Sequence, residues 1–226
     1  MGDAGDLEAK LAALLDFIDS APLTTTIAEL EHSLDGRKGS DVQALLVARE
    51  VSPEVLQAGL FARERMGRIN DIIHAVAIAL ALPRLLRPDE KLQRPSLAAG
   101  NDPSRPFDVS TDRRIAEFKL AKWDGHDAMR KRQLVKDLVH LAAESSGRSA
   151  ELYVLGERPR RFLTSTKSKV RWALDRSPAA RELFESQFGS LDISIPGFRH
   201  GYANHVKVID LEERFPKLFA EGSLPR

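Results

Sequence analysis

FDVSTDRRIAEFKL, at residues 107–120, carries the clearest signal for a particular fold in this sequence. Two runs of alternating apolar and polar residues flank a short polar turn, which predicts an antiparallel hairpin with strands at 107–110 and 115–122. The register that a two-residue turn imposes places Asp108 on the first strand directly opposite Glu117 on the second. The hairpin therefore brings two carboxylates to one face of a sheet.

The elements around the hairpin predict an α/β fold. A long apolar helix is expected at about 70–86, followed by a proline-rich loop at 87–106. After the hairpin, an amphipathic helix at 127–145 precedes a short buried strand at 152–155, and a late strand is expected near 206–211. A strand, a crossover helix and a second strand form a right-handed unit with parallel strands. We therefore predict a mixed sheet flanked by helices.

The remaining parts of the chain carry weaker signals. Residues 1–68 contain several helix starts and stops and predict a helical N-terminal region, either a cap or a helix-turn-helix-like module. Residues 69–226 would form the main domain. Within it we expect a short strand at 96–99, one helix around 167–188 and a glycine-containing loop at 199–205 that holds two histidines.

The composition is that of an ordinary globular protein of 226 residues, with 42% hydrophobic and 30% charged residues. Because the net charge is only +1, contact with nucleic acid would have to rely on locally gathered basic residues. The chain has no cysteine, which excludes a disulfide framework and a cysteine nucleophile and fits a reducing compartment.

The sequence predicts no attachment to a membrane. The N-terminus, MGDAGDLEAK, is acidic and lacks the basic and apolar regions of a signal peptide. The most apolar stretch, at 72–82, is far shorter than the ~20 residues that a membrane span requires. We therefore expect a cytoplasmic protein.

The two opposed carboxylates of the hairpin indicate a metal site. Side chains directly across a hairpin lie ~4.5–5.5 Å apart, where two ionised acids repel each other unless a cation lies between them. Mg²⁺ is usually held by one or two carboxylates together with waters and phosphate oxygens, which Asp108 and Glu117 would allow. Lys119 shares the face of Glu117 and is placed to stabilise charge on a phosphate. The alternative is an ordinary solvent-exposed strand face.

Residues 107–156 resemble the core of the PD-(D/E)xK, or restriction-endonuclease-like, superfamily. That core contains a hairpin with the pattern D…(D/E)xK, matched here by Asp108 and then by Glu117-Phe118-Lys119. The resemblance implies that the two acids bind Mg²⁺ or Mn²⁺ and that Phe118 lends its backbone carbonyl to the metal. It also implies that Lys119 assists the attacking water. The family's proline is absent before Asp108.

Members of this superfamily often add a polar residue from the helix that follows the hairpin. Gln133 is the candidate with a catalytic role here, and Arg130 lies one turn away on the same polar face. Many members also use an acid from the preceding helix. Asp71 and Glu64 are both candidates, and the sequence does not choose between them.

The resemblance implies a metal-dependent nuclease that acts on DNA rather than RNA, with bacterial defence or repair as a natural setting. The rival hypothesis is a non-catalytic interaction or nucleic-acid-binding protein that keeps the nuclease fold. A homodimer is one option for its oligomeric state. Basic residues that would contact backbone phosphates, unless they form ordinary solvated faces, are Arg130, Lys136, Arg160, Arg161, Lys167 and Lys169.

Overall fold

The chain divides into two compact units, Met1–Ile69 and Asn70–Arg226. The computed structural model describes residue 12 and residues 23–35, 39–49, 51–66, 69–93, 96–97, 107–125 and 127–219.

The first unit is helical in its described part, as the sequence predicts. Its helices are α2 (Leu23–Leu34), α3 (Gly39–Ala48) and α4 (Pro53–Met66). Pro53 opens α4, where its fixed φ and missing N–H do no harm. The additional helix expected from the leucine stripe at 7–18 lies outside the described residues. Whether this unit is a cap or a helix-turn-helix-like module stays a prediction.

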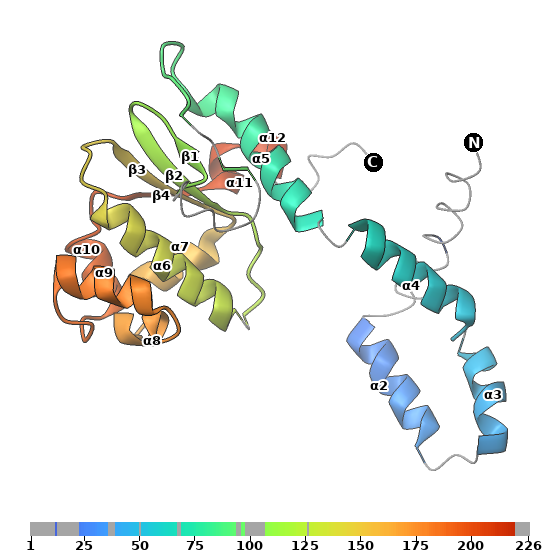
Figure 1. Cartoon of the computed structure of the whole chain (residues 1–226). Coiled ribbons are helices and arrows are strands. Elements are labelled where there is room, and N and C mark those ends of the chain that lie inside the picture. The colour runs from blue at the N-terminus through green and yellow to red at the C-terminus, as the bar shows by residue number, and fades with distance from the viewer. Residues whose placement is uncertain are drawn as a thin grey trace. The chain divides into compact units, whose positions relative to one another are not determined.

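The second unit contains a mixed sheet of four strands in the order β1-β2-β3-β4 (Figure 1). Its strands are β1 (Val109–Ser110), β2 (Arg114–Lys119), β3 (Ser149–Val154) and β4 (Lys207–Asp210). β1 pairs antiparallel with β2, whereas β2, β3 and β4 run parallel. The hairpin is therefore confirmed, although both strands are shorter than expected. Ser110 lies opposite Ile115, which is the predicted register.

Helices cover both faces of the sheet. The crossover helix α6 (Ala128–Ala143) connects β2 to β3 and packs on one face, with α7 to α10 on the same side. Helix α5 (Ile69–Leu85) packs on the other face through Ile78, Ala81 and Leu85 (Figure 1). No helix in the described part of the chain is long and apolar enough to span a bilayer.

The double cover explains the sequence of β2. A strand that is buried on both faces needs apolar residues at successive positions rather than on alternate ones. Ile115 packs towards α6, and Ala116 and Phe118 pack towards α5, where the Phe118 ring stacks on Tyr153 at 4.5 Å between centroids. Glu117 is thus a carboxylate inside a buried strand.

The remaining helices correct the sequence-based interpretation of the C-terminal part. They are α7 (Glu157–Ser165), α8 (Val170–Leu174), α9 (Pro178–Phe188), α10 (Ile195–His200), α11 (Leu211–Arg214) and α12 (Pro216–Phe219). The single helix expected at 167–188 is wrong, because α8 ends before α9 begins at Pro178. Proline has no N–H to continue a helix and disfavours the helical conformation at the residue before it.

Two further expectations hold only in part. Ser96 and Leu97 form no strand, although Ser96 donates its backbone N–H to the Asp108 carbonyl at 2.9 Å, and residues 98–99 lie outside the described chain. The expected loop at 199–205 begins inside α10, whose first turn is capped by the Ser194 hydroxyl, which accepts from the Gly197 N–H.

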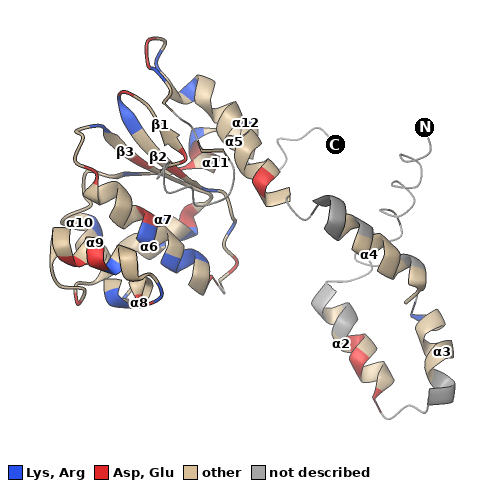
Figure 2. Cartoon of the chain, in the orientation of Figure 1, with Lys and Arg blue, Asp and Glu red and all other residues tan. Residues whose placement is uncertain are grey.

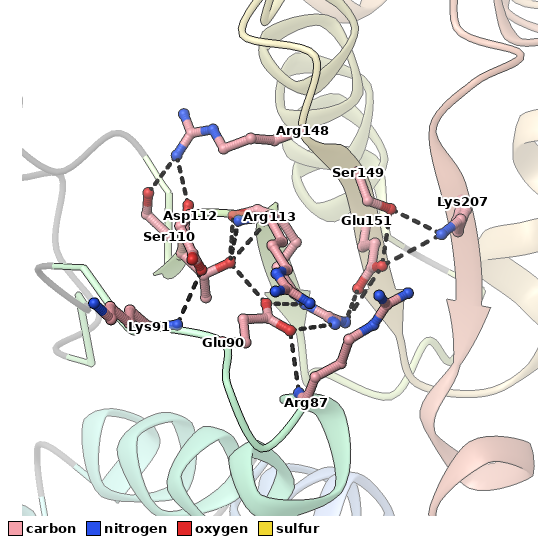
Figure 3. Close-up of polar contacts among 12 residues, drawn as sticks. Arg87, Glu90, Lys91, Ser110, Asp112, Arg113, Arg148, Ser149, Glu151 and Lys207 are labelled. Atoms are coloured by element: carbon pink, nitrogen blue, oxygen red, sulfur yellow. Dashed lines mark hydrogen bonds and ion pairs between the residues drawn. The ribbon is translucent and has the colours of Figure 1, made fainter.

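A buried ionic network connects the segment after α5 to the start of β2 (Figure 3). Lys119 lies at the other end of this strand. The Glu90 carboxylate is fully shielded and accepts from the Arg114 guanidinium at 2.6 and 2.8 Å and from the Thr111 hydroxyl at 2.7 Å. Arg114 also contacts Glu151 at 3.1 Å, and Glu151 accepts from the Tyr153 hydroxyl at 2.7 Å. Because each buried charge has a partner, the network fixes where the chain enters β1 and β2.

Replacing Glu90 with Gln should destabilise the protein by about 1.5–3 kcal/mol, the usual contribution of a hydrogen bond to a charged group. The Arg114 guanidinium lowers the pKa of Glu90 to about 2. This stabilisation is complete above the ordinary pKa of 4.5 and is lost as the pH falls towards 2. Urea unfolding between pH 2 and 7 measures both effects. Asp89→Asn, which removes an exposed partner of Arg113, is the control. Equal losses from the two variants would contradict a structural role for the network.

Candidate active site

The predicted site residues meet at the end of the sheet where β2 stops. Glu117 and Lys119 lie two apart on β2 and so point to the same face, the one covered by α6. Asp108 immediately precedes β1. The pairing of β1 with β2 ends at Val109 opposite Ala116, and the Asp108 side chain reaches the backbone N–H of Phe118 on β2.

Asp108 is held by contacts to a single carboxylate oxygen. Its Oδ2 accepts the backbone N–H of Phe118 at 2.8 Å and lies 3.3 Å from Nε2 of His74, which comes from α5. The other ring nitrogen of His74, Nδ1, lies 3.2 Å from the Leu97 carbonyl oxygen. Only the doubly protonated imidazolium can donate to both acceptors. The hydrogen bond to Asp108 accordingly raises the pKa of His74 above its ordinary value of 6.5.

Lys119 joins the sheet to α6. Its Nζ lies 3.2 Å from Oε2 of Glu117 and 2.7 Å from Oδ2 of Asp137, one of the buried residues of α6. One turn earlier on that helix, Gln133 donates its side-chain amide to the other oxygen of Asp137 at 2.8 Å. The site is therefore a chain of polar contacts from Gln133 through Asp137 and Lys119 to Glu117.

The buried charges of the site perturb one another. Burial, helped by the negative charges of Asp137 and Asp108 and opposed by Lys119, raises the pKa of the Glu117 carboxyl to about 9. For Lys119, burial favours the neutral amine, but the charges of Asp137 and Glu117 outweigh burial and raise its pKa. Lys119 thus contacts both acids, with Asp137 the nearer, and burial favours the neutral form of Glu117.

The charge balance of the site indicates where a cation would act. With every group ionised, three carboxylates (Asp108, Glu117 and Asp137) face two cations (Lys119 and His74), which leaves one excess negative charge. In the absence of a metal, a proton on Glu117 removes that excess. A bound divalent cation would displace the proton and allow Glu117 to ionise, because metal ligands must be deprotonated.

The donor set fits Mg²⁺ or Mn²⁺, which favour oxygen ligands. No group of three or more His, Cys, Asp or Glu side chains in the described residues is arranged to hold a metal ion. A metal would therefore rest on Asp108 and Glu117, the arrangement that Mg²⁺ uses when water and phosphate oxygens complete its shell. The backbone carbonyl of Phe118 lies between the two acids in the chain and stays a predicted ligand.

The other candidate residues differ in whether they reach the site. Gln133 reaches the site through Asp137 rather than directly. Arg130 turns away and contacts Asp127 at 2.6 Å and the Lys122 carbonyl at 3.2 Å. Asp71 lies on α5 less than one turn before His74, the residue that contacts Asp108. The side chain of Glu64, the other candidate acid, lies outside the described residues.

Two residues of the site, His74 and Asp137, were not among the sequence-based candidates. A signal for Asp137 exists, because it follows Gln133 by four positions and stands between the buried core residues Val135 and Leu138 of α6. A carboxylate inside an apolar helix face needs a partner. His74 is likewise a polar residue within the most apolar run of the chain, one turn before the buried Ala77 and Ile78.

Most of the predicted phosphate-binding residues already have acidic partners. Figure 2 shows basic and acidic residues intermixed over α6 and α7. The pairs are Arg130 with Asp127 (2.6 Å), Arg160 with Glu213 (2.7 Å), Arg161 with Glu157 (2.8 Å) and Lys169 with Asp192 (3.5 Å). Lys136 and Lys167 form no ion pair with the described residues. These two are the stronger candidates for contacts with backbone phosphates.

A cavity of about 580 Å³ lies beyond the carboxyl ends of the parallel strands. Lys122 and Trp123 line it after β2, Gly156 and Arg158 line it after β3, and Glu212 of α11 follows β4. Arg158 donates to the Trp123 carbonyl at 2.9 Å and so connects the two loops. Ligands of open α/β sheets bind at this end of the strands, which is also the end that carries Lys119.

Comparison of this chain with protein-family models, with curated proteins and with solved structures finds no match. A function for the chain has therefore to be inferred from the residues of the site and from their geometry.

Proposed function

We propose that this protein is a metal-dependent nuclease with a restriction-endonuclease-like core, which hydrolyses phosphodiester bonds in DNA rather than RNA in the cytoplasm. The observation that carries the proposal is the Glu117 carboxyl, which is buried on β2 and lies 3.2 Å from the ammonium of Lys119 in a site that also holds Asp108. A structural strand gains nothing from an acid that is kept uncharged by burial. A metal site does, because the positive charge of the cation stabilises the ionised form of the carboxylate.

The residues of the chain would divide the chemistry among them. Asp108 and Glu117 would hold the cation, which supplies Lewis-acid polarisation of the phosphoryl oxygens when bound. Water adds to phosphorus and gives up a proton to solvent, the bond to the leaving oxygen breaks and that oxygen takes up a proton, and the ammonium of Lys119 stabilises the negative charge that develops on the phosphate. His74 holds Asp108 in position, because its Nε2 contacts Oδ2 of Asp108.

A cleavage assay tests the proposal. Single-stranded and duplex DNA and an RNA of matched sequence are incubated with the protein in Mn²⁺, in Mg²⁺ and in EDTA. We expect cleavage that depends on the metal and is abolished by Glu117→Gln, which keeps the shape of the side chain. An RNA preference would correct the substrate class. The absence of both cleavage and Mn²⁺ binding would favour the rival hypothesis, a non-catalytic interaction protein.

Binding of DNA should depend most on the basic residues that lack acidic partners. Lys136→Ala and Lys167→Ala should weaken binding about equally for all sequences, and each should reduce the salt slope by about one. Arg130→Ala and Arg160→Ala should reduce it less, because Asp127 and Glu213 already neutralise these side chains. Fluorescence anisotropy at several salt concentrations measures the slopes. An unchanged slope in the double variant of Lys136 and Lys167 would identify both as ordinary surface charges.

A further inference from the structure

We propose that Asp137 is a positioning residue that competes with Glu117 for the ammonium of Lys119 and so keeps Glu117 available to a divalent cation. This inference rests on the proposed function, since it concerns the same site. It assigns to α6 a role in metal binding through a residue that need not contact the metal at all.

The geometry around Lys119 supports a division of its contacts. The ammonium lies between two carboxylates, 2.7 Å from Asp137 and 3.2 Å from Glu117. Asp137 is the nearer partner and comes from the opposite layer, α6, whereas Glu117 is a neighbour on β2 itself. Lys119 donates a hydrogen bond to Glu117, and the shorter ion pair with Asp137 competes with that bond for the same ammonium.

The side chain of Asp137 is itself fixed in place. Gln133 donates to Oδ1 at 2.8 Å, which leaves Oδ2 to face Lys119. The side chain is only 8% exposed, and within the described residues Oδ2 forms no well-oriented hydrogen bond. Its stabilisation therefore depends on the charge of Lys119, and a buried carboxylate whose oxygens are divided in this way has little freedom to rotate.

Loss of the Asp137 charge would redirect Lys119. In Asp137→Asn, the carbonyl of the new amide still accepts from Gln133, so its NH₂ group faces the ammonium and repels it. The remaining carboxylate within reach is Glu117. A lysine paired with Glu117 competes with the divalent cation for the same oxygens, so the substitution should weaken metal binding even if Asp137 never touches the metal.

The test is a double-mutant cycle with Mn²⁺ binding, measured by calorimetry on the full chain, as the readout. Asp137→Asn should weaken Mn²⁺ binding by about 10- to 100-fold, the usual effect of removing a group that orients a metal ligand. In a Lys119→Met background the same substitution should have no effect, because the competing cation is gone. Gln133→Leu, which only loosens Asp137, should cause a smaller loss of the same sign.

The possible results distinguish a role of Asp137 through Lys119 from a direct contact of Asp137 with the metal. Glu144→Gln, which removes an acid at the end of α6 that pairs with Arg148, should leave Mn²⁺ affinity unchanged and serves as the matched control. A loss that persists in the Lys119→Met background would show that Asp137 acts on the metal directly and would overturn the inference, as would unchanged affinity in Asp137→Asn. If Asp137→Asn fails to fold, the effect of Gln133→Leu on Mn²⁺ affinity, measured in the wild-type and Lys119→Met backgrounds, provides the same test. A wild type that binds no Mn²⁺ would overturn the proposed function, and this inference with it.

Discussion

Mn²⁺ binding and DNA cleavage should both be lost when Asp108 is replaced with Ala or Glu117 with Ala. These two side chains are the carboxylates of the hairpin, whereas the third acid of the site, Asp137, is paired with the ammonium of Lys119. Lys119→Ala should behave differently. It should leave metal binding largely intact and reduce the cleavage rate by about 10²–10³, the usual effect of losing one preorganised charge-stabilising group.

The comparison needs a control on the same hairpin. Asp112 lies in the turn, where its carboxylate accepts the Lys91 backbone N–H at 2.9 Å. Asp112→Asn should therefore leave both metal binding and cleavage unchanged. Asp108→Asn and Glu117→Gln repeat the test without a change of shape. Equal losses of cleavage in the Asp112 and Glu117 variants would contradict the assignment, because they would point to a damaged hairpin instead of a metal site.

The stability of the metal-free protein should fall as the pH rises from about 4.5 towards 9 because of Glu117. Burial raises the pKa of this carboxyl from 4.5 to about 9 in the folded protein. Folding therefore holds a proton that the unfolded chain releases, and the stabilisation is complete below pH 4.5 and lost as the pH passes through 9. The penalty for burying an ionised group is several kcal/mol, so the effect should be large.

Glu117→Gln isolates this effect, because the amide has no proton to lose. In EDTA the variant should be more stable than the wild type at pH 8 to 9 and should lose that advantage towards pH 5. Saturating Mn²⁺ should stabilise the wild type alone and reverse the order. Thermal melts across this pH range make the measurement. A wild type that stays more stable than Glu117→Gln at every pH in EDTA would show that the ionised carboxylate is an ordinary structural ion-pair partner of Lys119.

Local chemistry explains which parts of the fold could be predicted from the sequence. The hairpin followed from a polar turn between two apolar strands, and that information lies within residues 107–120. The crossover helix followed from its own periodicity. The break between α8 and α9 could also have been predicted, because Pro178 marks it, but the apolar pattern on both sides outweighed that signal.

The site could be predicted only where its residues belong to one segment. Asp108, Glu117 and Lys119 are set by the register of a single hairpin. His74 and Asp137 reach the same place from two helices on opposite faces of the sheet, so their contacts depend on how those helices pack. The partners of Arg160 and Lys169, which neutralise much of the expected basic surface, lie 53 and 23 residues further along the chain and leave no local pattern.

Calorimetric titration of Mn²⁺ at pH 7, in two buffers with different heats of ionisation, shows whether Glu117 is a ligand of the metal. We predict that each protein molecule binds Mn²⁺ with release of about one proton, because metal binding must displace the proton held by Glu117. We also predict that Glu117→Gln binds much more weakly and releases no proton. A wild type that shows no binding heat, or a Glu117→Gln variant that binds Mn²⁺ as the wild type does, would contradict the assignment of this site.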